Sequence, residues 1–158
     1  MTYTLQKPWQ KNAIIYYTQC LLHSYKHWTK ESLLDLSTTP EQQAQALFEA
    51  PFVVVSQGIE SDPILNYGNK KALELWELSW EDFIQLPGRE TAEEMERTAR
   101  RSFLNEASSK GFIKNYSGVR ISSKGQRFYI QNVLVWNVLD ENNRKCGQAA
   151  MFKSWKFV

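Results

Sequence analysis

The chain has few of the residues that mark metal-binding, disulfide-rich or membrane-spanning proteins. Its 158 residues include two cysteines, two histidines and five prolines. Cys20 and Cys146 lie far apart and lack C-x-x-C spacing, so we expect free thiols in a reducing compartment. No window approaches the roughly 20 apolar residues that a membrane helix needs, and the first residues lack the apolar run of a secretory signal. These absences predict a cytoplasmic protein without a membrane partner.

Strong charge of one sign is also missing. The net charge is +2, and no clustered basic face points to a nucleic-acid partner. A chain of this length buries a sizeable core without disulfides or metals. Aromatic residues are abundant, with six tryptophans among them. Such rings suit both a core and the walls of an apolar pocket.

The first part of the chain is predicted to be helical. Between residues 12 and 29, apolar residues recur at the spacing of one helix face: Ile14, Tyr17, Leu21, Tyr25 and Trp28. A second helix is signalled by Thr39, Pro40 and Gln42, because Thr39 and Gln42 form a capping box and proline suits a first turn.

Strand signals dominate the rest. Apolar or alternating runs predict strands at 52–55, 64–65, 112–122, 127–139 and 146–157, with a hairpin turn at 123–125. Helices are expected after Asn69, from Ser79 and Asp82, and from a Thr91–Glu94 capping box to about Ser108. Gly111 should end the last of these.

The segment 62–80, DPILNYGNKKALELWELSW, is the most informative. It predicts a short strand, a turn at Tyr67-Gly68 and an amphipathic helix that Asn69 caps. This unit resembles the second strand and following helix of a PAS domain. The predicted order of strands and helices is also similar to that of a PAS domain.

A narrower resemblance covers residues 33–155. The chain is similar to the MEKHLA domain, a PAS-related family, in matching segments at Ala50–Phe52, Asp62–Asn69, Ala72–Trp76, Leu86–Pro87, Gly111–Phe112, Tyr116–Ser122, Val135–Asn137 and Gly147–Ala150. The resemblance implies an α+β fold with a five-stranded antiparallel sheet covered by helices on one face. Residues 39–158 would form this domain, and residues 1–38 an N-terminal helical extension. It also implies a sensory or regulatory role, without established catalytic residues or a ligand that can be placed.

If the PAS-like core is complete without the extension, the apolar stripe of the 12–29 helix must be buried elsewhere. It would lie on the outer face of the sheet or against a second copy. We predict a homodimer through this helix.

A ligand cavity is expected between the inner face of the sheet and the helices at 70–108. Trp76 and Trp136 are predicted to share one core layer there, because Trp136 has the strand parity of Phe128 and Ile130. The residues predicted to bind a ligand are Asn69, Trp76, Trp80, Phe83, Arg89, Met95, Phe103, Trp136 and Gln148.

Cofactor chemistry finds little support. Cys20, His23 and His27 share a helix face and could bind zinc or haem iron, but only three ligands are present. The segment 83–89 holds no cysteine for a flavin adduct, although Asn132, Asn137 and Gln148 lie where flavin-binding PAS domains place amides. We therefore predict no cofactor, no metal site and a colourless protein.

Charged residues offer three further candidates. The carboxylates of Glu74, Glu81, Asp82 and Asp62 are explained more simply by turns and caps than by catalysis. The run 93–101 favours a solvated helix face with i, i+4 ion pairs. Among Arg89, Arg120 and Arg127, Arg89 is the strongest candidate to hold a carboxylate or phosphate, because it follows a turn near the predicted pocket.

The sequence thus favours a non-enzymatic module that binds a small molecule or a protein partner. One alternative is a pure interaction or dimerisation module with a filled core. The other is a small α+β cone-type isomerase or dehydratase, which would need an Asp/His pair that the sequence does not show. The volume of the cavity distinguishes the ligand-binding module from the interaction module with a filled core.

Overall fold

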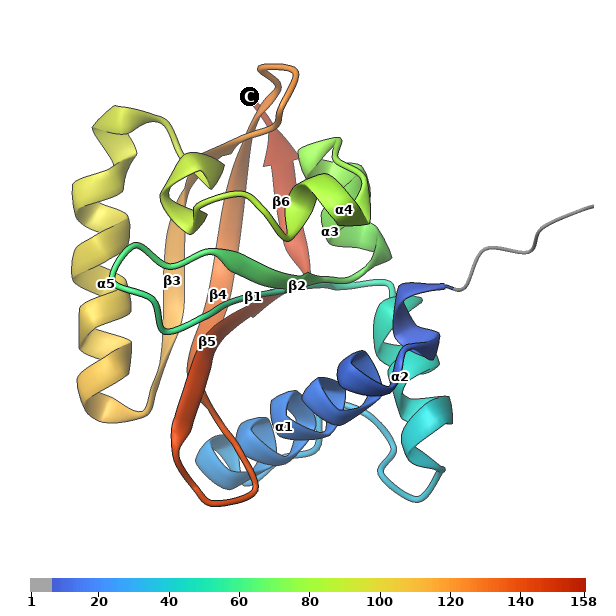
Figure 1. Ribbon diagram of the computed structural model, residues 1–158. Helices are drawn as coiled ribbons and strands as arrows, with labels where there is room; N and C mark the ends of the chain where they lie inside the picture. The colour runs from blue at the N-terminus through green and yellow to red at the C-terminus, as the bar shows by residue number, and fades with distance from the viewer. Residues whose placement is uncertain (1–6) are drawn as a thin grey trace, which may run out of the picture.

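An antiparallel sheet forms the centre of the computed structural model, which describes residues 7–158 (Figure 1). Its strands follow the order β2-β1-β5-β4-β3. They are β1 (Val53–Gln57), β2 (Leu65–Gly68), β3 (Phe112–Ile121), β4 (Arg127–Leu139) and β5 (Lys145–Phe152). The predicted last strand divides after Phe152, and its second part, β6 (Ser154–Phe157), pairs with the first residues of β4. The predicted antiparallel α+β architecture is confirmed.

Helices cover both faces of this sheet. On the face that we call inner lie α3 (Lys70–Trp76) and α5 (Arg97–Lys110), while α1 (Asn12–Thr29) and α2 (Pro40–Phe48) cover the outer face. The short α4 (Trp80–Phe83) packs beside β2 and contributes to both cores. Within residues 7–158, three 3₁₀ turns lie at Pro8–Gln10, Gly88–Thr91 and Glu94–Glu96. The predicted N-terminal extension therefore supplies the second layer of the molecule.

Local sequence signals placed most helix ends correctly. The side chains of Asn69, Thr39 and Ser79 each accept a hydrogen bond from a backbone N–H of the first turn that follows. Gly111 ends α5 with a φ of 93°. The Thr91 capping box is wrong, because its hydroxyl instead donates to the carbonyl of Gly88 and α5 begins only at Arg97.

The apolar stripe of α1 is buried against its own sheet. Leu21, Leu22 and Tyr25 are buried and pack with Trp136 of β4, whose indole N–H donates to the carbonyl of Leu21. The ring of Tyr25 meets that of Trp136 edge-on at 5.2 Å between centroids. The sheet of the same chain therefore covers this stripe, and a homodimer through this helix stays a prediction.

Trp76 and Trp136 do not share a core layer, contrary to the prediction. Trp136 belongs to the outer core with Tyr25, whereas Trp76 packs with Phe128 and Phe152 in the inner core. An extra residue in β4 lies between Ile130 and Val133, where Asn132 adopts a φ of 53°. This bulge reverses the alternation of side chains, so Trp136 faces the opposite way from Phe128.

Because the two indoles lie on opposite faces, we expect their contributions to stability to be independent. Trp76→Phe and Trp136→Phe should each destabilise, and their losses in unfolding free energy should add within about 0.5 kcal/mol. Urea unfolding of both single variants and the double variant measures this sum. A coupling above about 1 kcal/mol would mean that the tryptophans share a packing layer after all.

Candidate functional site

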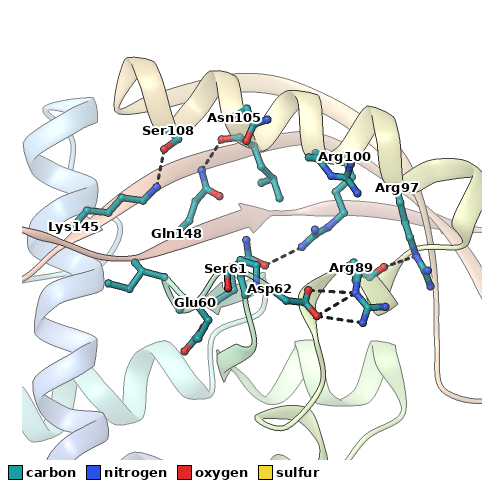
Figure 2. A pocket seen from close by; sticks show the side chains of 16 residues that line it. Glu60, Ser61, Asp62, Arg89, Arg97, Arg100, Asn105, Ser108, Lys145 and Gln148 are labelled. Carbon is teal, nitrogen blue, oxygen red and sulfur yellow. Dashed lines mark hydrogen bonds and ion pairs between the residues drawn. The ribbon is translucent and has the colours of Figure 1, made fainter.

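A cleft opens between α5 and the loop that joins β1 to β2 (Figure 2). Its volume is about 600 Å³, within the range of small-molecule sites. The loop contributes residues 57–63, and β5 contributes Lys145 and Gln148. One face of α5 forms the opposite wall with Arg97, Arg100, Arg101, Leu104, Asn105 and Ser108. The cleft therefore joins three segments that are distant in sequence.

The charge of this cleft is predominantly positive. Five basic side chains line it, namely Arg89, Arg97, Arg100, Arg101 and Lys145, against two acidic ones, Glu60 and Asp62. Both carboxylates already have partners. Glu60 accepts from the backbone N–H of Ile64, and Asp62 binds the Arg89 guanidinium at 3.2 Å. The arrangement attracts anions.

A smaller cavity of about 60 Å³ lies between α5 and the inner face of the sheet. Its walls are mainly apolar: Val55, Leu65, Trp76, Leu104, Ile130, Val133, Val135, Ala150 and Phe152. Four polar side chains interrupt them, namely Thr91, Arg100, Tyr116 and Arg120. Arg100 and Leu104 line both this inner cavity and the cleft, so these two side chains border both spaces.

Arg100 is held at the junction by a side chain of β1. Its Nη2 donates to Oε1 of Gln57 at 3.1 Å. Gly88 leaves room for this pair, since a Cβ there would collide with the Gln57 amide and lie 2.8 Å from Nη2 of Arg100. Burial, followed by the charge of Arg120, lowers the pKa of Arg100 to about 10. The charged guanidinium is therefore poorly solvated in this position.

Arg120 reaches the inner cavity from β3 and is only 5% exposed. Its Nη2 donates to the hydroxyl of Tyr116 at 2.8 Å, and its Nη1 to the carbonyl of Val119 at 2.9 Å. The ring of Tyr116 stacks on Phe103 of α5 with 4.0 Å between centroids. Phe103 thus supports the tyrosine that orients Arg120.

Some of the residues predicted to bind a ligand lie at these two spaces. Trp76 lines the inner cavity, while Gln148 and Arg89 line the cleft. Gln148 is tied to α5, because its Nε2 donates to the carbonyl of Leu104 at 2.9 Å. Phe83 packs against Trp76 in the inner core with 6.2 Å between ring centroids. Their role in binding remains a prediction.

Other predicted positions are corrected by the structure. Trp80 and Trp136 belong to the outer core, on the far side of the sheet from the cavity. Met95 is 78% exposed, because it precedes α5 rather than lying on it. Asn69 is fully buried, and its side chain hydrogen bonds to four backbone groups, of Val54, Ala72, Leu47 and Phe52. Asn69 therefore acts in folding.

Sequence reasoning missed Arg100. The run 93–101 was interpreted as a solvated helix face, with Glu96 paired to Arg100 and Glu93 to Arg97. Instead, Glu93 binds Arg127, and Arg97 donates to the carbonyls of Arg89 and Ala92. The spacing of residues 97, 100, 104 and 108 is that of one helix face, and this is the signal that could have found the cleft wall.

The predicted alternatives for cofactor chemistry are dispersed in the fold. His23 and His27 are exposed on α1, whereas Cys20 is buried against Cys146 of β5, where burial raises the pKa of the Cys146 thiol to about 11. Among residues 7–158, no group of three His, Cys, Asp or Glu side chains is placed to hold a metal. The amide of Asn137 donates to the carbonyl of Ser108, so it fastens β4 to α5.

Known structures share this fold. The PAS domain of a protein from Colwellia psychrerythraea matches with a TM-score of 0.63 at 16% identity, over 75% of this chain and 95% of that one. An RNA-binding light-oxygen-voltage receptor matches with a TM-score of 0.64 at 16% identity, over 78% of this chain and 36% of that one. A light-oxygen-voltage domain studied with a flavin analogue gives 0.58 at 13%, over 74% and 84%. The molecule therefore has a PAS-like fold.

The family is narrower than the fold. A model of the MEKHLA domain matches residues 15–157, so the chain belongs to the MEKHLA domain family. The match includes most of α1, which the sequence had assigned to an extension outside the domain. No curated protein matches the chain. Within residues 7–158, no helix has the length and apolarity needed to span a bilayer.

Proposed function

We propose that this MEKHLA domain is a non-enzymatic sensory or regulatory module that binds a small molecule between α5 and the inner face of the sheet. One observation carries the proposal. The cleft of about 600 Å³ and the apolar inner cavity share Arg100 and Leu104 in their walls, which supports a ligand that enters from solvent and buries part of its surface in the core. A pure interaction module with a filled core would need neither space.

The polar groups that face these spaces support binding rather than catalysis. They are arginines, a lysine, amides and hydroxyls, which hold and orient a ligand through hydrogen bonds. The two carboxylates of the cleft, Glu60 and Asp62, are already bound to a backbone N–H and to Arg89. Cys20 and Cys146 are free thiols, which supports a protein that acts in the reducing cytoplasm. One structural neighbour was studied with a flavin analogue, but an inner cavity of about 60 Å³ is far smaller than typical cofactor sites, which begin at about 300 Å³.

Filling the inner cavity should abolish binding. Ala150 of β5 lines the cavity, so Ala150→Leu would place a larger side chain in the space that the proposal reserves for the ligand. Native mass spectrometry of the full chain, freshly purified, should show a bound small molecule for the unmodified protein and none for Ala150→Leu.

Ala150→Gly is the matched control, because it changes the same position without filling the cavity. This variant should keep the bound molecule. If Ala150→Leu retains the same bound mass, or if the unmodified protein carries none and binds no compound in a small-molecule screen by thermal shift, the core is closed and the interaction-module alternative stands.

A further inference from the structure

Four arginines of this protein form two contrasting pairs. On the surface, Arg89 pairs with Asp62, and Arg127 pairs with Glu93 at 2.6 Å. At the inner cavity, Arg100 and Arg120 have no carboxylate within ion-pair distance among residues 7–158. Their hydrogen-bond partners are neutral: an amide, a phenol and a backbone carbonyl. Two poorly solvated guanidinium groups thus have only neutral partners.

This arrangement is energetically unusual. Buried charges in proteins are normally paired, because the loss of hydration is otherwise uncompensated. Here two guanidinium groups lie close enough for the charge of Arg120 to contribute to the lowered pKa of Arg100. Five planar N–H donors per arginine are available, and the hydrogen bonds within the chain use one donor of Arg100 and two of Arg120. Donors therefore remain for a ligand.

The surroundings restrict the kind of anion. Val55, Ile130, Val133 and Phe152 are apolar walls of the inner cavity that the arginines line. A free inorganic anion would leave these apolar walls without a contact. A ligand with an acidic head and a short apolar body would place the head between the arginines and the body against the sheet.

We propose that the two arginines, Arg100 and Arg120, form the recognition site for a short-chain monocarboxylate, whose carboxylate lies at the junction of cleft and inner cavity. This inference rests on the proposed function and specifies the chemical class of its ligand. A carboxylate has about four lone-pair positions, so one head group accepts from both guanidinium groups at once. The cleft leads to the site through its basic wall, which raises the local concentration of anions.

The test is calorimetric titration of the full chain at constant ionic strength with butyrate, hexanoate, octanoate and benzoate. At least one of these should bind with a Kd in the micromolar to low millimolar range, and its uncharged primary amide should bind at least tenfold more weakly. Inorganic phosphate should not compete with it. If no carboxylate in the series binds, or if amide and acid bind equally, the proposal is overturned.

Arg120→Met and Arg100→Met should each weaken carboxylate binding at least tenfold. Arg120→Met should also raise the melting temperature of the ligand-free protein, because an unpaired buried charge is replaced by an apolar side chain of similar length. A residue that recognises the ligand should lose binding and gain stability on this substitution. A purely structural residue should lose stability. Arg144→Met is the control, because this exposed arginine between β4 and β5 lines neither the cleft nor the inner cavity, and it should change the Kd less than twofold.

Two results distinguish this inference from the proposed function. If the amides bind as well as the acids and Ala150→Leu blocks both, the cavity binds ligands and the proposed function stands. The inference that the ligand carries a negative head group is then wrong. If Arg120→Met unfolds the protein, the Kd of Arg120→Lys tests the role of Arg120 in its place. This variant keeps the charge but loses the planar fork of donors, so the Kd should rise at least threefold while the protein stays folded.

Discussion

A chain that starts at residue 39 should not fold into a stable monomer. The resemblance to PAS domains predicts that residues 39–158 form a complete domain, yet α1 supplies Leu21, Leu22 and Tyr25 to the outer core. Removing one buried leucine typically costs about 2–5 kcal/mol, and whole domains are stable by about 5–15 kcal/mol. The free-energy cost of losing α1 therefore exceeds the free energy of unfolding that a domain of this size has. Trp136 would also be exposed to water.

The measurement compares the full chain with residues 39–158 by circular dichroism and light scattering. We expect the short chain to aggregate or to melt without a cooperative transition. Leu21→Ala and His23→Ala provide a matched pair within α1, since one side chain is buried and the other is exposed. The first should cost about 2–5 kcal/mol and the second less than about 0.5 kcal/mol.

A cooperative transition of the short chain at the melting temperature of the full chain would contradict this expectation. The division after residue 38 would then be correct, and the apolar stripe of α1 would be free to contact a second copy. Light scattering of the full chain reports the mass in either case.

Asn69→Ala should be among the most damaging single substitutions. The buried Asn69 side chain accepts from the backbone N–H groups of Val54 and Ala72, and it donates to the carbonyls of Leu47 and Phe52. Removing it strands two buried N–H groups, which cost about 1–3 kcal/mol each, and two carbonyls. We expect a loss of about 3–6 kcal/mol in unfolding free energy, measured by urea denaturation.

Two comparisons separate this network from a simple helix cap. Ser79→Ala removes the exposed cap of α4 and should cost about 0.5–2 kcal/mol. Asn69→Asp keeps an oxygen that caps α3 but directs a carboxylate at two carbonyl oxygens. It should therefore destabilise at least as much as Asn69→Ala. A harmless Asn69→Asp would mean that capping is the whole role of this residue.

Local patterns in the sequence predicted most of the helices and strands of the fold. Capping side chains such as Thr39 and Asn69 contact backbone within their own turn or the next segment, so the start of each helix is visible in a few residues. The strands and their order were also predicted from the sequence, and the family resemblance rests on the same segments. The start of α5 was misplaced by five residues, because the Thr91 hydroxyl donates to a carbonyl of the preceding turn.

The candidate site was only partly visible. Trp76, Arg89 and Gln148 were predicted from their elements, and they line the inner cavity or the cleft. Arg100 was missed, because an arginine next to glutamates along a helix is usually solvated. Only the packing of α5 against β3 and β4 brings that arginine to Gln57 and near Arg120.

The sequence by itself determined the elements, their order and the family, because these depend on contacts between near neighbours and on patterns along one segment. The tertiary structure decided which face each side chain serves. One extra residue near Asn132 turns Trp136 away from Phe128, and a bulge is set by pairing with a strand that lies elsewhere in the sequence. It also decided that α1 covers the sheet and that Arg100 meets Arg120, since burial of a charge depends on what packs around it.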